Sequence, residues 1–269
     1  MRLLALTLLA LMPAANVVTA QGLSASEQKI VDSARSRYYS LDLNGFLSYK
    51  CTVKFDFSTV PILPSDNPSE NLALLKSTQF AITEDRDGPT VSHTYPSGTS
   101  ETAKRRADPM TNLLTSLVKG LFLTWPTKGL HGPIPSFNSQ IKSVAETSNG
   151  FEFILSFPGD PVRIDLDRNY LATEIVSVGG KVDERPKYSP SPDGLIFIGN
   201  HAIDNEDSGE VELEYDLESS TIDGLRLPTS AHLVIHPNID VRFALDECSV
   251  NKGTVLTVLP PKTAATPKH

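Results

Sequence analysis

The spacing of apolar residues near the beginning of the chain is that of an amphipathic helix. Ser24 stands three residues before Glu27, which is the spacing of a capping box at the start of a helix. Apolar side chains then recur at helical intervals, at Ile30, Val31, Ala34 and Tyr38. The pattern predicts a helix within residues 23–40 that buries one face.

The next segment, FLSYKCTVKFDF at 46–57, alternates with a period of two. One side of the alternation is wholly apolar and consists of Leu47, Tyr49, Cys51, Val53, Phe55 and Phe57. Because successive side chains of a strand point to opposite faces of a sheet, this segment is predicted to be a strand with one buried face. Cys51 then points toward the core.

Cap and turn signals divide the following residues into a short helix and a hairpin. Asn67-Pro68 supplies an N-cap followed by proline at the first helical position, which predicts a helix through Leu75. Asp87-Gly88 lies between two strand-like segments and is typical of a tight hairpin turn.

The most apolar segment after the first twenty residues is TNLLTSLVKGLFLTW at 111–125. The pattern is helical from Ser100 to Trp125, with Asp108-Pro109 predicted as a cap where one helix ends and the next begins. One wide apolar stripe forms on the helical wheel from Leu113, Leu114, Leu117, Val118, Leu121, Phe122 and Trp125. Core packing is the simplest role for the stripe, since it stabilises by about 1.5–3 kcal/mol per side chain, and lining an apolar cavity is the alternative.

The rest of the chain is rich in strand patterns. Strands are expected at 141–148, 150–158, 161–167, 171–178, 194–203, 209–217, 230–236 and 240–250, and the segment from Pro186 to Gly194 is expected to be a break between strands. In VELEYDL the apolar Val211, Leu213 and Tyr215 take one side and acidic residues the other. Such alternation is typical of an antiparallel sheet with one dry and one wet face.

The order of these elements indicates an α+β fold. About ten strands form a strongly curved antiparallel sheet, a half-barrel packed on helices, because sheets of this size rarely stay flat. We expect a single domain over residues 21–262, followed by a disordered tail at 263–269.

The first twenty residues are typical of a secretory signal peptide. Arg2 precedes an apolar run from Leu3 to Met12, and small residues lead to an expected cleavage after Ala20. The run is about half the twenty residues that a membrane-spanning helix needs, and no later segment reaches that length. We therefore expect an exported bacterial protein, periplasmic or secreted, without a transmembrane segment after cleavage.

Charge and cysteines narrow the possible partners. Removing Arg2 leaves 23 basic against 32 acidic residues, a net charge of −9 with neutral histidines, which disfavours binding to nucleic acid or to anionic lipid surfaces. Cys51 and Cys248 are the only cysteines. In an oxidising compartment a lone pair favours a disulfide, and two buried free thiols are the alternative.

The sequence contains no recognisable motif for catalysis, metal binding or cofactor binding. His232 and His236 lie in a strand pattern, where residues four apart are about 13 Å from each other. The acidic residues Asp204, Glu206, Asp207 and Glu210 lack the spacing of a calcium loop and are interpreted as a solvated hairpin tip. No nucleophile elbow or phosphate-binding loop occurs. We expect no enzyme, metal or cofactor, and a hydrolase with an unrecognised site is left as an alternative.

The overall pattern resembles the lipoprotein-carrier fold of LolA and LolB. The resemblance rests on YKCTVKFDF and on two segments in which an apolar strand, a short turn and a second apolar strand recur, VRIDLDRNYLATEIVSVGGK and GEVELEYDLESSTIDGLRLPTSAHLVI. It implies a non-enzymatic protein that holds acyl chains of a lipid or lipoprotein, or another apolar ligand, between sheet and helices. By this resemblance the ligand faces the stripe together with Tyr49, Val53 and Phe55. A structural or protein-interaction domain without a ligand cavity is the second interpretation.

Overall fold

The computed structural model describes residues 22–60, 67–85, 87–156, 161–177, 179, 181–206 and 209–253. The predicted signal peptide, its cleavage after Ala20 and the predicted tail at 263–269 lie outside these residues. Among the residues described, no helix is long and apolar enough to span a membrane.

The described chain forms helices mainly in its first half and strands throughout. The helices are α1 (Ala25–Arg35), α2 (Pro68–Ser77), α3 (Glu101–Thr124) and α4 (Pro126–Gly129), with a 3-10 turn at Asn138–Gln140. The strands are β1 (Phe46–Phe55), β2 (Gln79–Asp85), β3 (Gly88–Thr94), β4 (Ile141–Glu146), β5 (Gly150–Leu155), β6 (Val162–Asp167), β7 (Ala172–Ser177), β8 (Val182–Ser191), β9 (Gly194–Glu206), β10 (Gly209–Ile222), β11 (Leu225–Ile235) and β12 (Ile239–Lys252).

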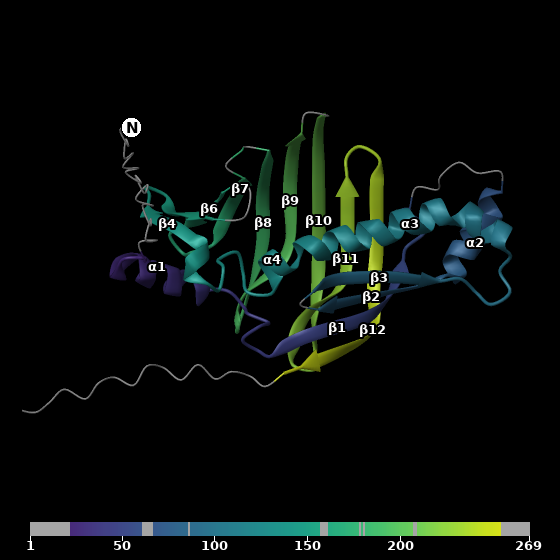
Figure 1. Cartoon of the computed structure of the whole chain (residues 1–269), viewed down its shortest axis with the longest axis horizontal. Helices are drawn as coiled ribbons and strands as arrows, with labels where there is room; N and C mark the ends of the chain where they lie inside the picture. The colour runs from purple at the N-terminus through teal and green to yellow at the C-terminus, as the bar shows by residue number, and fades with distance from the viewer. Residues whose placement is uncertain are drawn as a thin grey trace, which may run out of the picture.

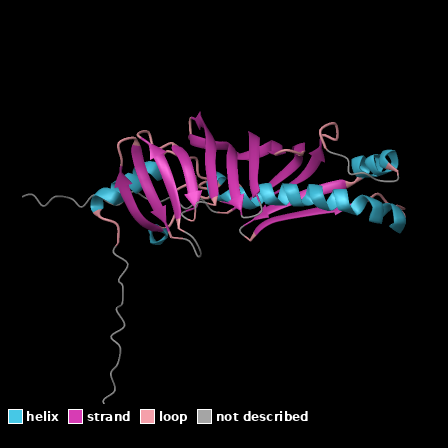
Figure 2. Cartoon of the chain, turned by 90° about the horizontal axis from the view of Figure 1, so that it is seen from above, coloured by secondary structure: helices cyan, strands magenta, loops and turns pink. Residues whose placement is uncertain are grey.

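All twelve strands belong to one antiparallel sheet, ordered β3-β2-β1-β12-β11-β10-β9-β8-β7-β6-β5-β4 (Figure 1). Neighbours in the sheet are neighbours in the chain, except that β1 pairs with β12. The sheet curves without closing into a barrel, and α3 runs across its strands on the concave side, as the view from above shows (Figure 2). The α+β class predicted from the sequence fits this arrangement.

Local signals in the first half of the chain are confirmed. The Ser24 side chain accepts a hydrogen bond from the Glu27 amide, and the Glu27 carboxylate accepts one from the Ser24 amide, which completes the capping box. Helix α1 ends at Arg35, earlier than the pattern allows. Helix α2 has Pro68 in its first turn, and β2 and β3 form the expected hairpin.

The predicted break at Asp108-Pro109 is wrong, because α3 continues through Pro109 as one helix. Proline has no amide hydrogen to donate to the carbonyl four residues earlier, so the continuity has to come from other contacts. The Tyr95 hydroxyl donates to Asp108 Oδ1 at 2.8 Å and lies 3.1 Å from Thr111 Oγ1. Ser100 caps the beginning of the helix through the amide of Ala103.

The predicted break from Pro186 to Gly194 is also wrong, because β8 runs from Val182 to Ser191. Strand β8 pairs with β9 along its whole length. Among the residues described, it pairs with β7 only at Asp183 and Glu184. Pro186 therefore lies where one side of the strand is an edge, the place where a sheet tolerates a missing amide hydrogen.

Two apolar clusters cover the concave face. The larger joins α3 to β1, β2 and β9–β12, and the smaller lies beneath α1 over β4–β7. The boundary between them follows the short pairing of β7 with β8.

Cys51 and Cys248 form a disulfide, as the sequence predicts. It links β1 to β12 next to an irregularity in their register between Lys50 and Thr52. The bond joins residues 197 positions apart in the chain, and it lies at the one place where sheet neighbours are distant in sequence.

Candidate functional site

The predicted stripe of α3 lies in the larger apolar cluster. Leu114, Val118 and Phe122 are fully buried, Leu121 and Trp125 nearly so, and Leu113 and Leu117 are partly buried against the same cluster. From the first strand, Tyr49 and Val53 are buried and Phe55 is half-buried. The structure thus brings all ten predicted ligand-facing residues together, packed on one another and on the sheet. Their contact with a ligand stays a prediction.

A hollow opens on the concave face beside the end of this stripe. It measures about 230 Å³ and is called the concave pocket here. Its lining comes from β8–β11 and the last residue of α3: Thr124, Val182, Glu184, Asn200, Ala202, Asp204, Val211, Leu213, Tyr215 and Ile235.

Strand register explains why this part of the sheet is hollow. Ala202 on β9 pairs with Glu184 on β8 and with Leu213 on β10, and Leu213 pairs with Ile235 on β11. Directly paired residues point to the same face. The methyl group of Ala202 is the smallest side chain of this row and projects least from the sheet, so a hollow is left above it. Longer side chains on both sides form the walls.

A bulge places Ala202 on the concave face. Lys187 pairs with Gly199 but Tyr188 pairs with Phe197, so Ile198 is an extra residue in β9. One extra residue moves every later side chain to the other face. Phe197 and Asn200 therefore both face the core, although a strict alternation would separate them.

At the polar end of the pocket the lining residue Glu184 pairs with a buried lysine. Lys128 on α4 is 5% exposed, and its Nζ lies 2.6 Å from Glu184 Oε2. The Asn200 side-chain amide donates to the same oxygen at 2.7 Å. Removing two charges from water costs several kcal/mol per ion before their attraction is counted, so this pair is weak evidence of a stability role and stronger evidence of a specific arrangement.

Two acceptors on residues that line the pocket have no donor among the residues that the structure describes. They are Asn200 Oδ1, on a residue that is 2% exposed, and Asp204 Oδ1. Buried polar atoms in folded proteins nearly always have a partner. These two atoms mark the pocket as a place where a donor is missing.

Tyr215 closes the inner side of the pocket under the end of α3. Its hydroxyl lies 3.5 Å from Thr124 Oγ1. Burial raises the pKa of the Tyr215 phenol well above its ordinary value, so the group stays neutral at physiological pH. Tyr215 can therefore donate or accept a hydrogen bond but contributes no charge.

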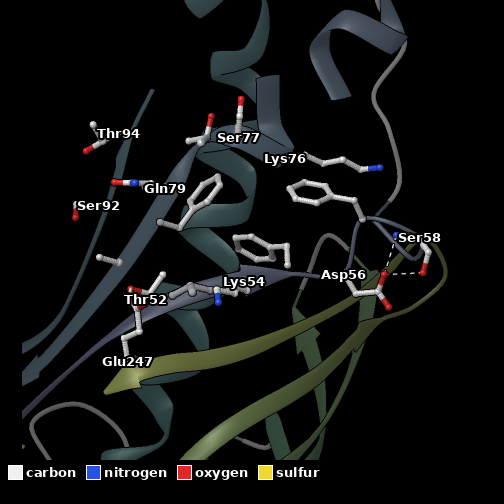
Figure 3. Close-up of a pocket in the computed structure, with 16 residues that line it drawn as sticks. Thr52, Lys54, Asp56, Ser58, Lys76, Ser77, Gln79, Ser92, Thr94 and Glu247 are labelled. Atoms are coloured by element: carbon white, nitrogen blue, oxygen red, sulfur yellow. Dashed lines mark hydrogen bonds between the residues drawn. The ribbon is translucent and has the colours of Figure 1, made fainter. Parts of the chain in front are cut away.

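A second, larger concavity of about 900 Å³ lies on the other side of β1–β3 and is called the outer groove here (Figure 3). Thr52, Lys54 and Gln79 from β1 and β2 line it together with the end of α2 at Lys76. Lys54 is paired with Asp246 at 2.8 Å, and both side chains are exposed. The labelled side chains carry hydroxyls, an amide and charges, and the rest of the lining adds the apolar side chains of Val53, Phe55, Phe57, Phe80 and Ala81.

None of the ten predicted ligand-facing residues lines the concave pocket, and sequence patterns indicated only the dry face on which it lies. The alternation in 209–217 placed Leu213 and Tyr215 on a common dry face, and Tyr215 is 1% exposed. The acidic residue Asp204, interpreted as part of a solvated hairpin tip, is half-buried and lines the pocket. Lys128, Glu184 and Asn200 were missed, because no local pattern relates a residue of α4 to residues of β8 and β9.

The histidines show no metal-binding arrangement. His232 lies 3.0 Å from Asp240 across the β11–β12 pair, and His201 lies 2.8 Å from Glu212 on β10. Among the residues described, no group of three or more His, Cys, Asp or Glu side chains is placed to hold a metal ion.

Comparison of the chain with protein-family models, with curated proteins and with solved structures finds no match. The site therefore has to be interpreted from its own geometry.

Proposed function

We propose that this chain is an exported, non-enzymatic protein that binds an apolar or acylated ligand in the manner of a lipoprotein carrier, with the concave pocket as the binding site. The single observation that supports this is the pocket itself, a hollow with an apolar wall of Val182, Val211, Leu213 and Ile235. Small-molecule sites are mostly apolar concavities with a few placed polar groups.

Two further features agree with the proposal. The half-barrel shape expected of a carrier leaves a concave face that α3 covers only in part. Val211, which lines the pocket, is 46% exposed. An acyl chain that enters past Val211 would cover it.

The volume limits what is bound. The pocket holds the equivalent of about eight waters at about 30 Å³ each, which is small for a ligand site. A short chain or one end of a longer chain fits, while the rest of the ligand extends over the neighbouring surface.

Ligand uptake can be tested with purified protein and a fluorescent fatty-acyl probe, alongside native mass spectrometry of protein isolated from a bacterial periplasm. Ala202→Phe fills the hollow and should abolish probe binding. Ile203→Phe adds a ring at the next residue of β9, on the opposite face, and should leave binding unchanged. Circular dichroism checks that both variants fold. The proposal fails if the parent protein carries no ligand and takes up no probe, or if both variants bind as the parent does.

A further inference from the structure

Asn200 lines the concave pocket, and the orientation of its side-chain amide is fixed. Its Nδ2 donates to Glu184 Oε2 at 2.7 Å, and reversing the amide would put two acceptor oxygens against each other. The orientation is therefore set by Glu184, and Oδ1 must point elsewhere. On a residue that is only 2% exposed, this oxygen has no donor among the described residues.

A second acceptor lies further along the same strand. Asp204 is four residues after Asn200 on the same face of β9, a separation of about 13 Å along the strand, and its Oδ1 is also buried without a donor among the described residues. Ala202 lies between them. The hollow over Ala202 therefore lies between two lining residues that each carry an unpaired acceptor, and a side-chain shift has to uncover either oxygen before a bound molecule can contact it.

The charge of the pocket lining indicates whether the donor on the ligand is cationic, neutral or anionic. Glu184 and Asp204 bring two carboxylates to the lining. Lys128 neutralises Glu184, since its Nζ lies 2.6 Å from Glu184 Oε2, and it also lies 3.5 Å from Thr127 Oγ1. The lining thus has one negative charge in excess, at Asp204 on the far side of Ala202, which repels an anionic head group and attracts a cationic one.

From these contacts we infer that the ligand of the concave pocket has a primary ammonium head group on an apolar body. The inference rests on the proposed function and specifies its ligand class. A primary ammonium has three N–H donors and no acceptor, so it satisfies Asn200 Oδ1 or Asp204 Oδ1 and neutralises the excess charge. The apolar body lies against Leu213, Val211 and Ile235.

Four probes with the same eight-carbon chain test this by isothermal titration calorimetry: octylammonium, octyltrimethylammonium, octanol and octanoate. Octylammonium should bind about tenfold or more tightly than octyltrimethylammonium, which has the charge but no N–H, because charge-assisted hydrogen bonds are the stronger class. Octanoate should bind weakest.

Variants locate the head group. Asn200→Leu and Asp204→Asn should each weaken octylammonium binding and leave octyltrimethylammonium less affected. The matched controls are Asn205→Leu and Glu210→Gln, because both residues are exposed and neither lines the pocket. Thermal unfolding of each variant checks the fold, and Asp204→Asn suffices if Asn200→Leu does not fold.

The outcomes separate the two proposals. If octanoate binds as tightly as octylammonium, the ammonium head group is wrong while ligand binding stands. If octylammonium binds no tighter than octyltrimethylammonium, or if the controls weaken binding as much as the pocket variants, the assigned acceptors are wrong. If none of the four probes binds, both the head group and the proposed function fail.

Discussion

Glu84 should make the stability of this protein depend strongly on pH. It lies on β2 between Tyr49 of β1 and Pro89 of β3, is 1% exposed, and neither carboxylate oxygen has a donor among the described residues. Burial raises the pKa of the Glu84 carboxyl from its ordinary value of 4.5 to about 8, and the negative charge of Asp85 adds to the effect.

The sign of the pH dependence follows from whether the folded or the unfolded state holds the proton on Glu84. Between pH 4.5 and about 8 the folded protein keeps a proton on Glu84 that the unfolded chain has lost. Folding therefore takes up a proton, and the free energy of unfolding falls as the pH rises through this window. Well below pH 4.5 Glu84 is protonated in both states and the free energy of unfolding is not reduced. Above about pH 8 Glu84 is ionised in both states, and the reduction in the free energy of unfolding is complete and constant.

The magnitude follows from the width of the window. A difference of 3.5 between 4.5 and about 8 corresponds to about 5 kcal/mol, since each pH unit is worth about 1.36 kcal/mol. That is comparable with the whole stability of many domains, about 5–15 kcal/mol.

The substitution Glu84→Gln tests this reasoning, because glutamine imitates the protonated acid and does not titrate. Urea unfolding at pH 5, 7 and 9 should show variant and parent nearly equal at pH 5 and the variant more stable by about 4–5 kcal/mol at pH 9. Glu210→Gln, at an exposed residue, should show no such divergence. A constant difference between Glu84→Gln and the parent across this range would refute the buried, protonated carboxyl.

Three further changes have expected outcomes that stability measurements can check. Replacing Cys51 and Cys248 together by serine should lower the free energy of unfolding by up to about 5 kcal/mol, because the bond closes a loop of 197 residues; an unchanged urea midpoint would contradict a structural role for the disulfide. Leu114→Ala should cost about 2–5 kcal/mol in chemical denaturation, whereas Leu123→Ala on the same helix, at a residue that is 55% exposed, should cost less than about 0.5 kcal/mol. Equal costs would mean that the stripe does not face the core. Lys128→Met should lower the free energy of unfolding by less than the loss of about 3–5 kcal/mol that is typical of a fully buried pair, because the Glu184 carboxylate is 23% exposed and keeps its hydrogen bond from Asn200. Most of this loss should return when Glu184 is made apolar as well; a double variant no more stable than the single one would argue against this account.

The parts of the fold that could be predicted from the sequence depend on contacts between residues close in the chain. The capping box at Ser24, the hairpin at Asp87-Gly88 and the alternation in β1 each involve only neighbouring positions. The packing of the stripe in α3 could also be anticipated, since its width required a partner.

The errors arise where a distant contact overrides the local signal. Helix α3 continues through Pro109 at a point where the Tyr95 hydroxyl contacts Asp108. Pro186 is tolerated because β7 pairs with only the beginning of β8.

The candidate site was missed for the same kind of reason. The extra residue Ile198 turns Asn200, Ala202 and Asp204 to the concave face, whereas simple alternation after Phe197 directs them outward. No periodicity in a single sequence announces a bulge. The pairing of Lys128 with Glu184 depends on tertiary packing alone.

The pairing of β1 with β12 has a consequence for how the chain could be rewired. The sheet order is the chain order read in a circle, beginning at β4 and ending at β3, with α3 and α4 as the strap between these two edges. The Gly253 amide donates to the Gly45 carbonyl at 2.8 Å, so the end of β12 touches the residue that precedes β1. A circular permutant joined at this contact, with new ends within the strap, would be an uninterrupted up-and-down meander, but it would lack residues 22–44 and with them α1, which packs over β4–β7. Its lower contact order should make it fold faster than the natural connectivity, in which β1 pairs with the last strand, and the loss of the α1 contacts should make it less stable.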